Sequence, residues 1–338
     1  MGRGSLLLVV GLLLASGCGS DTDSSGDSSG ESAGGAFPAR VEHKFGTTKV
    51  PAKPKRIVTV GLTEQDTVLA LGYKPIATSE WYGDQPHAVW PWARDELGDT
   101  KPTVLNNQDG FELERIASLR PDLILGVNSG MRPGDYDKLS RLAPTIPPGK
   151  GSTRYFSPWD QQVGLIAAAL GKPREGRELV EGLKADYAKA AAAHPEFRGK
   201  TATFSQNAFY DGLIYAYPDG LATDFLTMLG FKINPKLTPL IEREGEQVGV
   251  SAERLDVLDA DVMVFATEKP SEVSDLFEVP TFGKLKAVSE NRVVYTDATL
   301  AGAMYFISPL SLPYTLEHLT PQLEAAVRGK APRKVLGG

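Results

Sequence analysis

The residue types that carry out most enzyme chemistry are few and scattered in this chain. Its four histidines, His43, His87, His194 and His318, lie far apart in the sequence, and it has a single cysteine. A site for a bare metal ion gathers several His, Asp or Glu side chains, and a hydrolase pairs a nucleophile with a base. Residues Gly26–Gly30 match the G-x-S-x-G pattern of hydrolases, but linker sequence surrounds them where a strand and a helix are needed. We therefore predict no catalytic residues, no metal site and no resident cofactor.

The single cysteine, Cys18, directly follows an apolar leader. Residues 1–17 contain Arg3 and an apolar run from Leu6 to Ala15, which is the pattern of a secretory signal peptide. The run is too short to span a membrane comfortably. The residues before Cys18, Leu-Ala-Ser-Gly, resemble a bacterial lipobox, after which the cysteine is lipidated and becomes the first residue of the mature protein. An ordinary signal peptide with an incidental cysteine is the alternative.

A polar segment separates Cys18 from the first apolar pattern. Residues 19–36 consist almost entirely of Gly, Ser, Asp and other small or polar residues, too polar to fold. We expect residues 18–40 to form a flexible tether that holds a folded domain at the outer face of the cytoplasmic membrane, in the cell envelope. The formal net charge of −6 argues against a nucleic acid partner.

The elements that must position any binding residues are organised around one long helix. In the segment Arg174–His194, apolar residues recur every four positions among charged ones, as in Leu179, Leu183 and Tyr187. Pro195 ends the pattern, because proline cannot continue a helix. The pattern predicts a helix of about 31 Å, long enough to cross a small domain.

The sequences on either side of this helix repeat one design. Glu114–Leu125 (ERIASLRPDLIL) and Glu253–Val264 (ERLDVLDADVMV) share the pattern E-R-[IL]-x-x-L-x-x-D followed by aliphatic residues. The pattern predicts a short amphipathic helix and a buried strand on each side. We therefore predict an α/β fold of two similar lobes joined by one helix: an N-terminal lobe (41–172), the connecting helix (173–195) and a C-terminal lobe (196–330).

Strands that alternate with helices predict mostly parallel sheets, whose loops at the carboxyl ends of the strands build binding sites. In the N-terminal lobe, a loop rich in aromatic residues follows a strand at Pro75–Thr78. In the C-terminal lobe we expect an aromatic loop with Phe209, Tyr215 and Tyr217, and a second loop at Ala298–Ile307.

Three segments in this order and spacing carry a family resemblance: Lys49–Thr78, Phe111–Gly126 (FELERIASLRPDLILG) and Val250–Thr267 (VSAERLDVLDADVMVFAT). Together with the long helix, they resemble the iron-siderophore and vitamin B12 substrate-binding proteins of bacterial ABC importers, over about residues 40–328. The resemblance implies two Rossmann-like lobes joined by a single long rigid helix, the helix-linked periplasmic-binding fold, with a ligand in the shallow cleft between them.

The resemblance also implies partners and a docking site. The ligand would be a ferric siderophore whose own oxygens hold the iron, and the partners would be permease subunits with a cytoplasmic ATPase. Where the family has a glutamate on each lobe that docks onto permease arginines, this chain has Glu114 and Glu253. The alternative is an ordinary acidic residue in a first helical turn. We expect a monomer, and a cleft that closes only slightly because a packed helix limits the swing of the lobes.

The ligand-binding residues are predicted from their positions in loops, because a chelate needs aromatic walls and a few polar or basic groups. The predicted residues are Trp81, Tyr82, Arg132, Arg154, Tyr155, Phe209, Tyr215, Arg243 and Tyr305. The chemical class of the siderophore stays open between hydroxamate, catecholate and carboxylate, although the modest number of arginines favours the less anionic ones. Vitamin B12 or haem binding by the same fold is the alternative.

Overall fold

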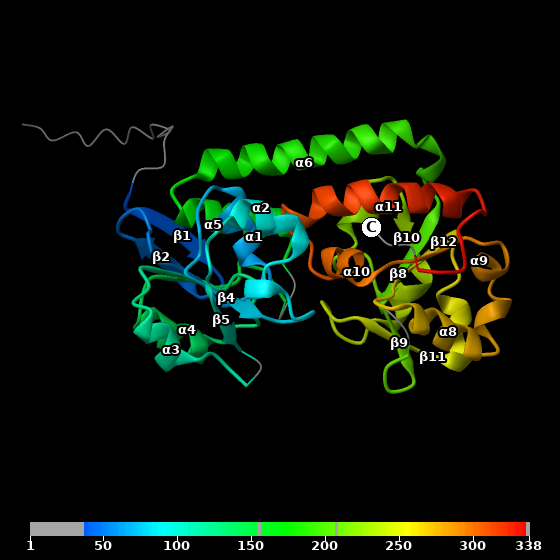
Figure 1. Cartoon of the computed structure of the whole chain (residues 1–338), viewed down its shortest axis with the longest axis horizontal. Helices are drawn as coiled ribbons and strands as arrows, with labels where there is room; N and C mark the ends of the chain where they lie inside the picture. Colours follow the sequence, from blue (N-terminus) through cyan, green and yellow to red (C-terminus); the bar gives the residue numbers. More distant parts are fainter. Residues whose placement is uncertain (1–36, 108, 154–156, 207–208, 336–338) are drawn as a thin grey trace, which may run out of the picture. The chain divides into compact units, whose positions relative to one another are not determined.

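Each lobe of the structure is built on its own open β-sheet, and one helix joins the two (Figure 1). The computed structural model describes residues 37–335, except for residues 108, 154–156 and 207–208. The predicted lipidation site, Cys18, and its leader therefore lie outside the described residues. The described residues belong to one compact unit, Ala33–Gly338. Since that unit is not divided further, the predicted boundaries between the lobes stay predictions.

The N-terminal lobe contains a five-stranded parallel sheet in the order β5-β4-β3-β6-β7. Successive residues of β6 contribute to opposite faces: Leu123 and Leu125 pack against α1 and α5, whereas Ile124 packs against α3 and α4. Because helices cover both faces, the strands are short runs of buried aliphatic residues.

The elements of this lobe are the antiparallel hairpin β1 (Ala39–His43) and β2 (Gly46–Val50), strands β3 (Ile57–Thr59), β4 (Ala77–Glu80), β5 (Thr103–Asn106), β6 (Leu123–Leu125) and β7 (Thr145–Ile146), helices α1 (Glu64–Ala70), α2 (Arg94–Leu97), α3 (Leu113–Ser118), α4 (Pro133–Ser140) and α5 (Trp159–Ala169), and the 3₁₀ turns η1 (Pro86–Ala88) and η2 (Pro91–Ala93).

The C-terminal lobe contains a six-stranded sheet in the order β11-β9-β8-β12-β13, with β10 also paired to β8. Strands β8, β10, β12 and β13 are parallel, whereas β9 and β11 are antiparallel to their neighbours. Its elements are β8 (Thr201–Gln206), β9 (Leu213–Tyr217), β10 (Lys232–Ile233), β11 (Val248–Ser251), β12 (Val262–Ala266), β13 (Val293–Tyr295), α7 (Asp224–Thr227), α8 (Pro270–Glu278), α9 (Lys286–Ser289), α10 (Ala298–Tyr305), α11 (Ser311–Val327), and the 3₁₀ turns η3 (Pro195–Phe197), η4 (Pro235–Leu240), η5 (Ala252–Val257) and η6 (Phe282–Lys284).

Helix α6 (Pro173–Ala193) joins the lobes and runs along both of them in Figure 1. The helix predicted from the pattern at Arg174–His194 is confirmed to within one residue at each end. Leu179 packs against the cores of both lobes, whereas Leu183 and Tyr187 are buried in the C-terminal core. The Tyr187 hydroxyl donates a hydrogen bond to the Leu312 carbonyl of α11 (2.9 Å). Among the described helices, α6 included, none is both long and apolar enough to cross a membrane.

Two predictions for the C-terminal lobe are wrong. Tyr215 and Tyr217 belong to strand β9 rather than to a loop, and Tyr217 pairs with Phe204 of β8. The predicted loop at Ala298–Ile307 is mostly helix α10. Most of the residues of α10 are buried, so no polar face marks the helix in the sequence. The Asp297 side chain caps it by accepting a hydrogen bond from the Leu300 amide (2.8 Å).

The two lobes also meet directly through a set of packed rings, which we call the aromatic wall. Trp90 stacks on Trp92 with centroids 4.9 Å apart and on Tyr82 with centroids 5.3 Å apart. The wall consists of Trp81, Tyr82, Trp90 and Trp92 from the N-terminal lobe and Tyr305, Phe306 and Tyr314 from the C-terminal lobe. Helix α10 approaches this wall at Gly302, where an added Cβ would overlap the Trp90 ring.

This close approach predicts that Gly302→Ala destabilises the protein. Trp90 cannot retreat because it is held between Trp92 and Tyr82, so we expect the free energy of unfolding to fall by about 1–3 kcal/mol. Gly182→Ala in α6 is the matched control, because that helical glycine is exposed with open space around it. It should stabilise the protein by roughly 0.5–1 kcal/mol. Urea unfolding measures both, and equal stability of Gly302→Ala and the parent would contradict the close packing.

Candidate ligand-binding site

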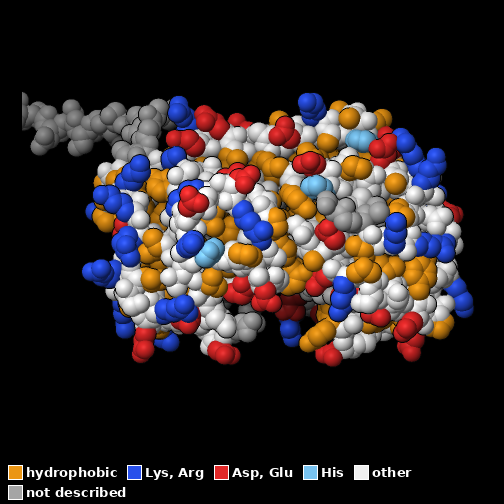
Figure 2. Space-filling model, viewed as in Figure 1, with side chains coloured by type: hydrophobic (Ala, Val, Ile, Leu, Met, Phe, Trp, Pro, Cys, Tyr) orange, Lys and Arg blue, Asp and Glu red, His pale blue; other side chains and the backbone are white. Residues whose placement is uncertain are grey.

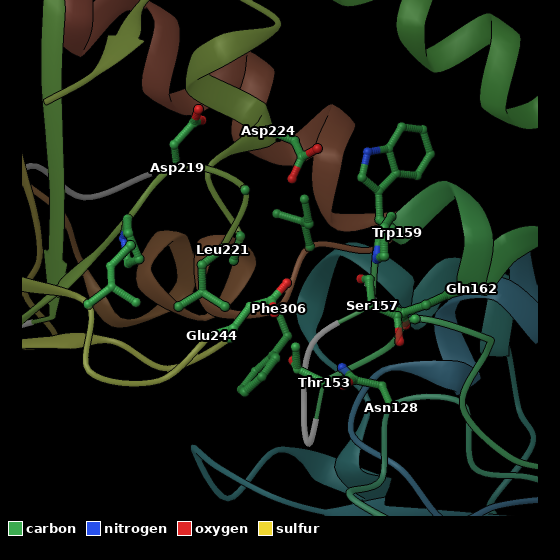
Figure 3. A pocket seen from close by; sticks show the side chains of 18 residues that line it. Asn128, Thr153, Ser157, Trp159, Gln162, Asp219, Leu221, Asp224, Glu244 and Phe306 are labelled. Atoms are coloured by element: carbon green, nitrogen blue, oxygen red, sulfur yellow. Dashed lines mark hydrogen bonds between the residues drawn. The ribbon is translucent and has the colours of Figure 1, made fainter. Parts of the chain in front are cut away.

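A pocket of about 470 Å³ lies between the two lobes (Figure 3). Figure 2 shows the surface hollowed between the lobes on the side away from α6. In the N-terminal sheet the chain turns to opposite sides from the adjacent strands β3 and β6. In open α/β sheets, the loops that follow two such neighbouring strands run in opposite directions, and a crevice forms between them. The pocket receives a residue from this point, Asn128, in the loop after β6.

The N-terminal wall of the pocket comes from the loop after β6 and the start of α5. Asn128 is 3% exposed, and its backbone amide donates to the Glu64 carboxylate at 2.7 Å. Trp159 is 2% exposed and lies in the first turn of α5. Gln162, one turn later, donates from Nε2 to the Ser157 carbonyl (2.9 Å) and so fixes the loop before the helix. These contacts hold an amide and an indole ring at fixed positions on this wall.

The C-terminal wall comes from the turn after β9, the start of α7 and the segment after α10. The turn Pro218–Leu221 is held by a hydrogen bond from the Gly220 amide to the Thr223 hydroxyl (3.2 Å). Leu221 and Phe306 present apolar surface, and Asp224 presents a carboxylate (Figure 3). Phe306 is shared between the pocket and the aromatic wall, since Trp81 packs edge-on against it with centroids 5.1 Å apart.

Two buried carboxylates lie behind the N-terminal wall, at the start of α1. Burial raises the pKa of Glu64 to about 7, although hydrogen bonds from the amides of Asn128 and Thr63 oppose the shift. Burial likewise raises the pKa of Asp66 to about 6. Asp66 Oδ2 accepts hydrogen bonds from the Trp92 indole (2.8 Å) and from the hydroxyl of Ser308 in the C-terminal lobe (2.5 Å). Asp66 therefore joins the two lobes beside the aromatic wall.

Those predicted aromatic residues that the structure describes do not line this pocket. Trp81, Tyr82 and Tyr305 come together in the aromatic wall, one layer behind it. The Tyr305 hydroxyl donates to the Ala266 carbonyl and to Glu268, both at 3.0 Å. Phe209 packs against the C-terminal core, and Tyr215 pairs with Gly249 of β11. Their roles in ligand binding stay predictions.

The predicted arginines lie apart from one another. Arg132 is paired with Asp135 at 3.2 Å and lines a separate depression on the N-terminal lobe. Arg243 is exposed and paired with Glu246 at 3.3 Å, next to the pocket residue Glu244. Arg154 and Tyr155 lie outside the described residues; their sequence neighbours Thr153 and Ser157 line the pocket.

The predicted docking residues are both exposed. Glu114 lies in α3, and Glu253 lies in the 3₁₀ turn η5 that follows β11. Figure 1 shows α3 and β11 on the side of the molecule away from α6. The arrangement agrees with one docking face, although docking itself stays a prediction.

Sequence reasoning missed most residues of the pocket wall. A signal existed for Trp159, because Ser157-Pro158-Trp159 has the composition of a helix start after a strand and its loop. The turn Pro218-Asp219-Gly220 is likewise a recognisable turn after a strand. Within the described residues, no three or more His, Cys, Asp or Glu side chains converge in a way that could hold a metal ion.

Comparison with known proteins agrees with this geometry. The sequence model of a family described as periplasmic binding protein matches residues 57–300. The probable siderophore-binding lipoprotein YfiY of Bacillus subtilis is 29% identical over 281 residues, which cover 80% of each chain. The iron(3+)-hydroxamate-binding protein YxeB of the same organism is 27% identical over 331 residues, or 94% of each chain.

Solved structures show the same fold. A periplasmic solute binding protein from Mycobacterium smegmatis superimposes with a TM-score of 0.79 at 38% identity, covering 86% of this chain and 98% of the other. PiaA of Streptococcus pneumoniae in complex with ferrichrome gives a TM-score of 0.75 at 27% identity, covering 86% and 99%.

Two α/β lobes that are joined by one helix and enclose a pocket define a solute-binding protein. This chain belongs to the periplasmic binding protein family, whose model covers most of its length. The predicted family resemblance and the predicted two-lobed fold are thereby confirmed.

The buried Asp66 predicts a pH dependence of stability that Asp66→Asn removes. Its pKa is about 6 in the folded protein and near 4 in an unfolded chain, so the folded state binds more protons between these values. Stability should therefore fall as the pH rises from about 4 to about 6, by about 3 kcal/mol more in the parent than in the variant. Urea unfolding across this range measures the difference, with the exposed Asp275→Asn as control. Equal slopes for the parent and Asp66→Asn would contradict the assignment.

Proposed function

We propose that this protein is the extracytoplasmic substrate-binding receptor of an ABC importer and that it captures an iron(III)-siderophore complex. The observation that carries the proposal is the pocket of about 470 Å³ between the lobes, at the carboxyl ends of the strands. Its volume falls within the range of about 300–1,000 Å³ typical of small-molecule sites. The names of relatives such as YfiY and YxeB, which specify siderophore and iron(3+)-hydroxamate binding, support this ligand class.

The chemistry of the pocket suits a chelate better than a bare ion. Trp159, Leu221 and Phe306 supply aromatic and apolar surface for the organic part of the ligand. The iron stays wrapped by the oxygens of its chelator, so the protein needs neither metal ligands nor a resident cofactor. The ligand is bound and released unchanged, and the protein acts without turnover.

Delivery completes the proposed cycle. Lipidation at Cys18 would anchor the monomeric receptor at the outer face of the cytoplasmic membrane, and the tether would let it reach its permease. The exposed Glu114 and Glu253 would each meet an arginine of the permease, because a carboxylate and a guanidinium form bidentate hydrogen bonds. A cytoplasmic ATPase would then drive import.

Trp159 gives a direct test of the pocket. Calorimetry with residues 19–338 and a ferric trihydroxamate should show saturable binding, and Trp159→Ala should weaken it about tenfold or more, because a buried aromatic contact typically dominates such sites. Phe277→Ala on α8 is the matched control: this ring is 36% exposed and does not line the pocket. Its dissociation constant should equal that of the parent.

Cobalamin, haem and ferric citrate complete the ligand set. If only cobalamin or haem binds, the proposed ligand is wrong and the alternative ligand of the same fold is correct. If a Trp159→Ala variant that thermal unfolding shows to be folded binds the chelate as tightly as the parent, the ligand does not bind in this pocket.

The docking residues predict a separation of binding from transport. A double variant, Glu114→Gln with Glu253→Gln, should bind the ferric chelate as the parent does but reduce its uptake into cells about tenfold or more. Glu178→Gln with Glu181→Gln, two exposed positions of α6, is the control pair and should leave uptake unchanged. Normal uptake by the first pair would contradict docking through these carboxylates.

A further inference from the structure

The charged side chains on the described part of the pocket wall are all acidic. They are Asp219 and Asp224, beside the turn after β9, and Glu244, in the loop before β11. Two basic groups near the described wall are paired with other carboxylates. Lys184 of α6 is bound by Asp160 at 2.6 Å, and Arg243 is paired with Glu246 at 3.3 Å. The wall therefore presents carboxylates to whatever enters the pocket.

The negative charge of Asp224 is only partly compensated by its surroundings. Burial raises the pKa of Asp224, and the nearby charges of Asp160 and Asp219 raise it further, while a hydrogen bond from the backbone amide of Asp224 and the charge of Lys184 oppose the shift. A positive group placed beside Asp224 would relieve this repulsion, and a negative one would add to it. The carboxylates also do not converge into a metal-binding group within the described residues. A bare metal ion needs such a group, whereas one or two carboxylates are enough to bind an ammonium.

A second observation points to a ligand independently of the charges. Asn128 is 3% exposed, and its Oδ1 atom has no hydrogen-bond partner within the described structure. Figure 3 shows its side chain directed into the pocket, on the N-terminal wall. A buried acceptor in a folded protein is usually satisfied by a protein group, a water molecule or a bound ligand. The Asn128 amide oxygen can therefore accept a hydrogen bond from a ligand in the pocket.

The pocket also contains a ring that tolerates positive charge. Trp159 is 2% exposed and lines the pocket, and the Lys184 ammonium lies 5.7 Å from its ring centroid. The face of an indole ring attracts cations through its quadrupole. The carboxylates, the Asn128 amide oxygen and the Trp159 indole of the described wall all favour hydrogen-bond donors or cations.

We infer that the pocket selects iron chelates that carry a protonated amine, with the ammonium bound at Asp224 and Asp219, and that it disfavours chelates with a net negative charge. The inference rests on the proposed function, since it specifies the charge of the chelate that the pocket takes. An ammonium at a carboxylate forms charge-assisted hydrogen bonds. An anionic chelate instead meets the like charges of the wall, and repulsion of this kind is how a site rejects a wrong ligand.

A matched pair of ligands tests the inference. One is the ferric complex of a linear trihydroxamate that ends in a primary ammonium; the other is the same complex with that amine acetylated. The two share their iron shell and differ by one charge. Calorimetry with residues 19–338 near neutral pH and at low ionic strength should give about tenfold tighter binding of the ammonium form. Added salt should narrow the ratio, and ferric citrate should bind more weakly than either.

Two variants locate the effect. Asp224→Asn should reduce the ratio between the two dissociation constants to about threefold or less, and Asp219→Asn should reduce it in the same direction. Asp219 lies in an exposed turn, so its variant keeps the test valid if Asp224→Asn unfolds more readily. Asp275→Asn on the exposed face of α8 is the control and should keep the full ratio.

The outcomes separate the inference from the proposed function. Equal binding of the two trihydroxamates, or tighter binding of the acetylated one, would overturn the charge selection and leave a siderophore receptor in place. A ratio that survives in both Asp224→Asn and Asp219→Asn would place the ammonium elsewhere and overturn the assignment. If neither complex binds, both the proposed function and this inference are contradicted.

Discussion

The contact on which the rest of the structure depends is the desolvated joint between the lobes. At its edge, the Asp66 carboxylate accepts hydrogen bonds from Trp92 in its own lobe and from Ser308 in the other. Beside it, the aromatic wall buries ring faces from both lobes, and each such ring removes roughly 150–250 Å² from water. Separation of the lobes here would expose this surface and remove Ser308, one of the two hydrogen-bond partners of the buried Asp66 carboxylate. If helix α6 were the only connection, the lobes could separate without exposing this surface.

The joint determines where the ligand pocket lies and what it is made of. Phe306 belongs to the aromatic wall on one side and to the pocket on the other. The backbone amide of Asn128 donates a hydrogen bond to Glu64, which lies two residues before Asp66 at the start of α1. The pocket is thus positioned by Glu64, by the neighbouring Asp66 that joins the lobes, and by the rings of the aromatic wall. Its own wall consists of loops and helix starts, such as the turn Pro218–Leu221 and the first turn of α5.

Periodicity and the internal repeat were enough to predict the two lobes, the connecting helix and the parallel strands, because those patterns record which faces are buried. They failed where burial is complete or where pairing is long-range. Helix α10 is buried nearly all round, and β9 is defined by its antiparallel partners β8 and β11. For the site, sequence reasoning chose large aromatic residues. In the structure, the Tyr82 ring packs against both Trp81 and Tyr305. Large rings of this kind gain much of their stabilisation from packing against one another. The pocket wall came instead from turns such as Pro218–Leu221, whose meeting with α5 depends on how the lobes dock.

The most direct test of a ligand held between the lobes is the position of the iron itself. Crystals of residues 19–338 grown with a ferric trihydroxamate, measured at the iron absorption edge, would locate it by anomalous scattering. The account predicts one strong peak inside the pocket lined by Trp159, Leu221 and Phe306. A peak outside that pocket, in a protein that binds the same complex in solution, would contradict it.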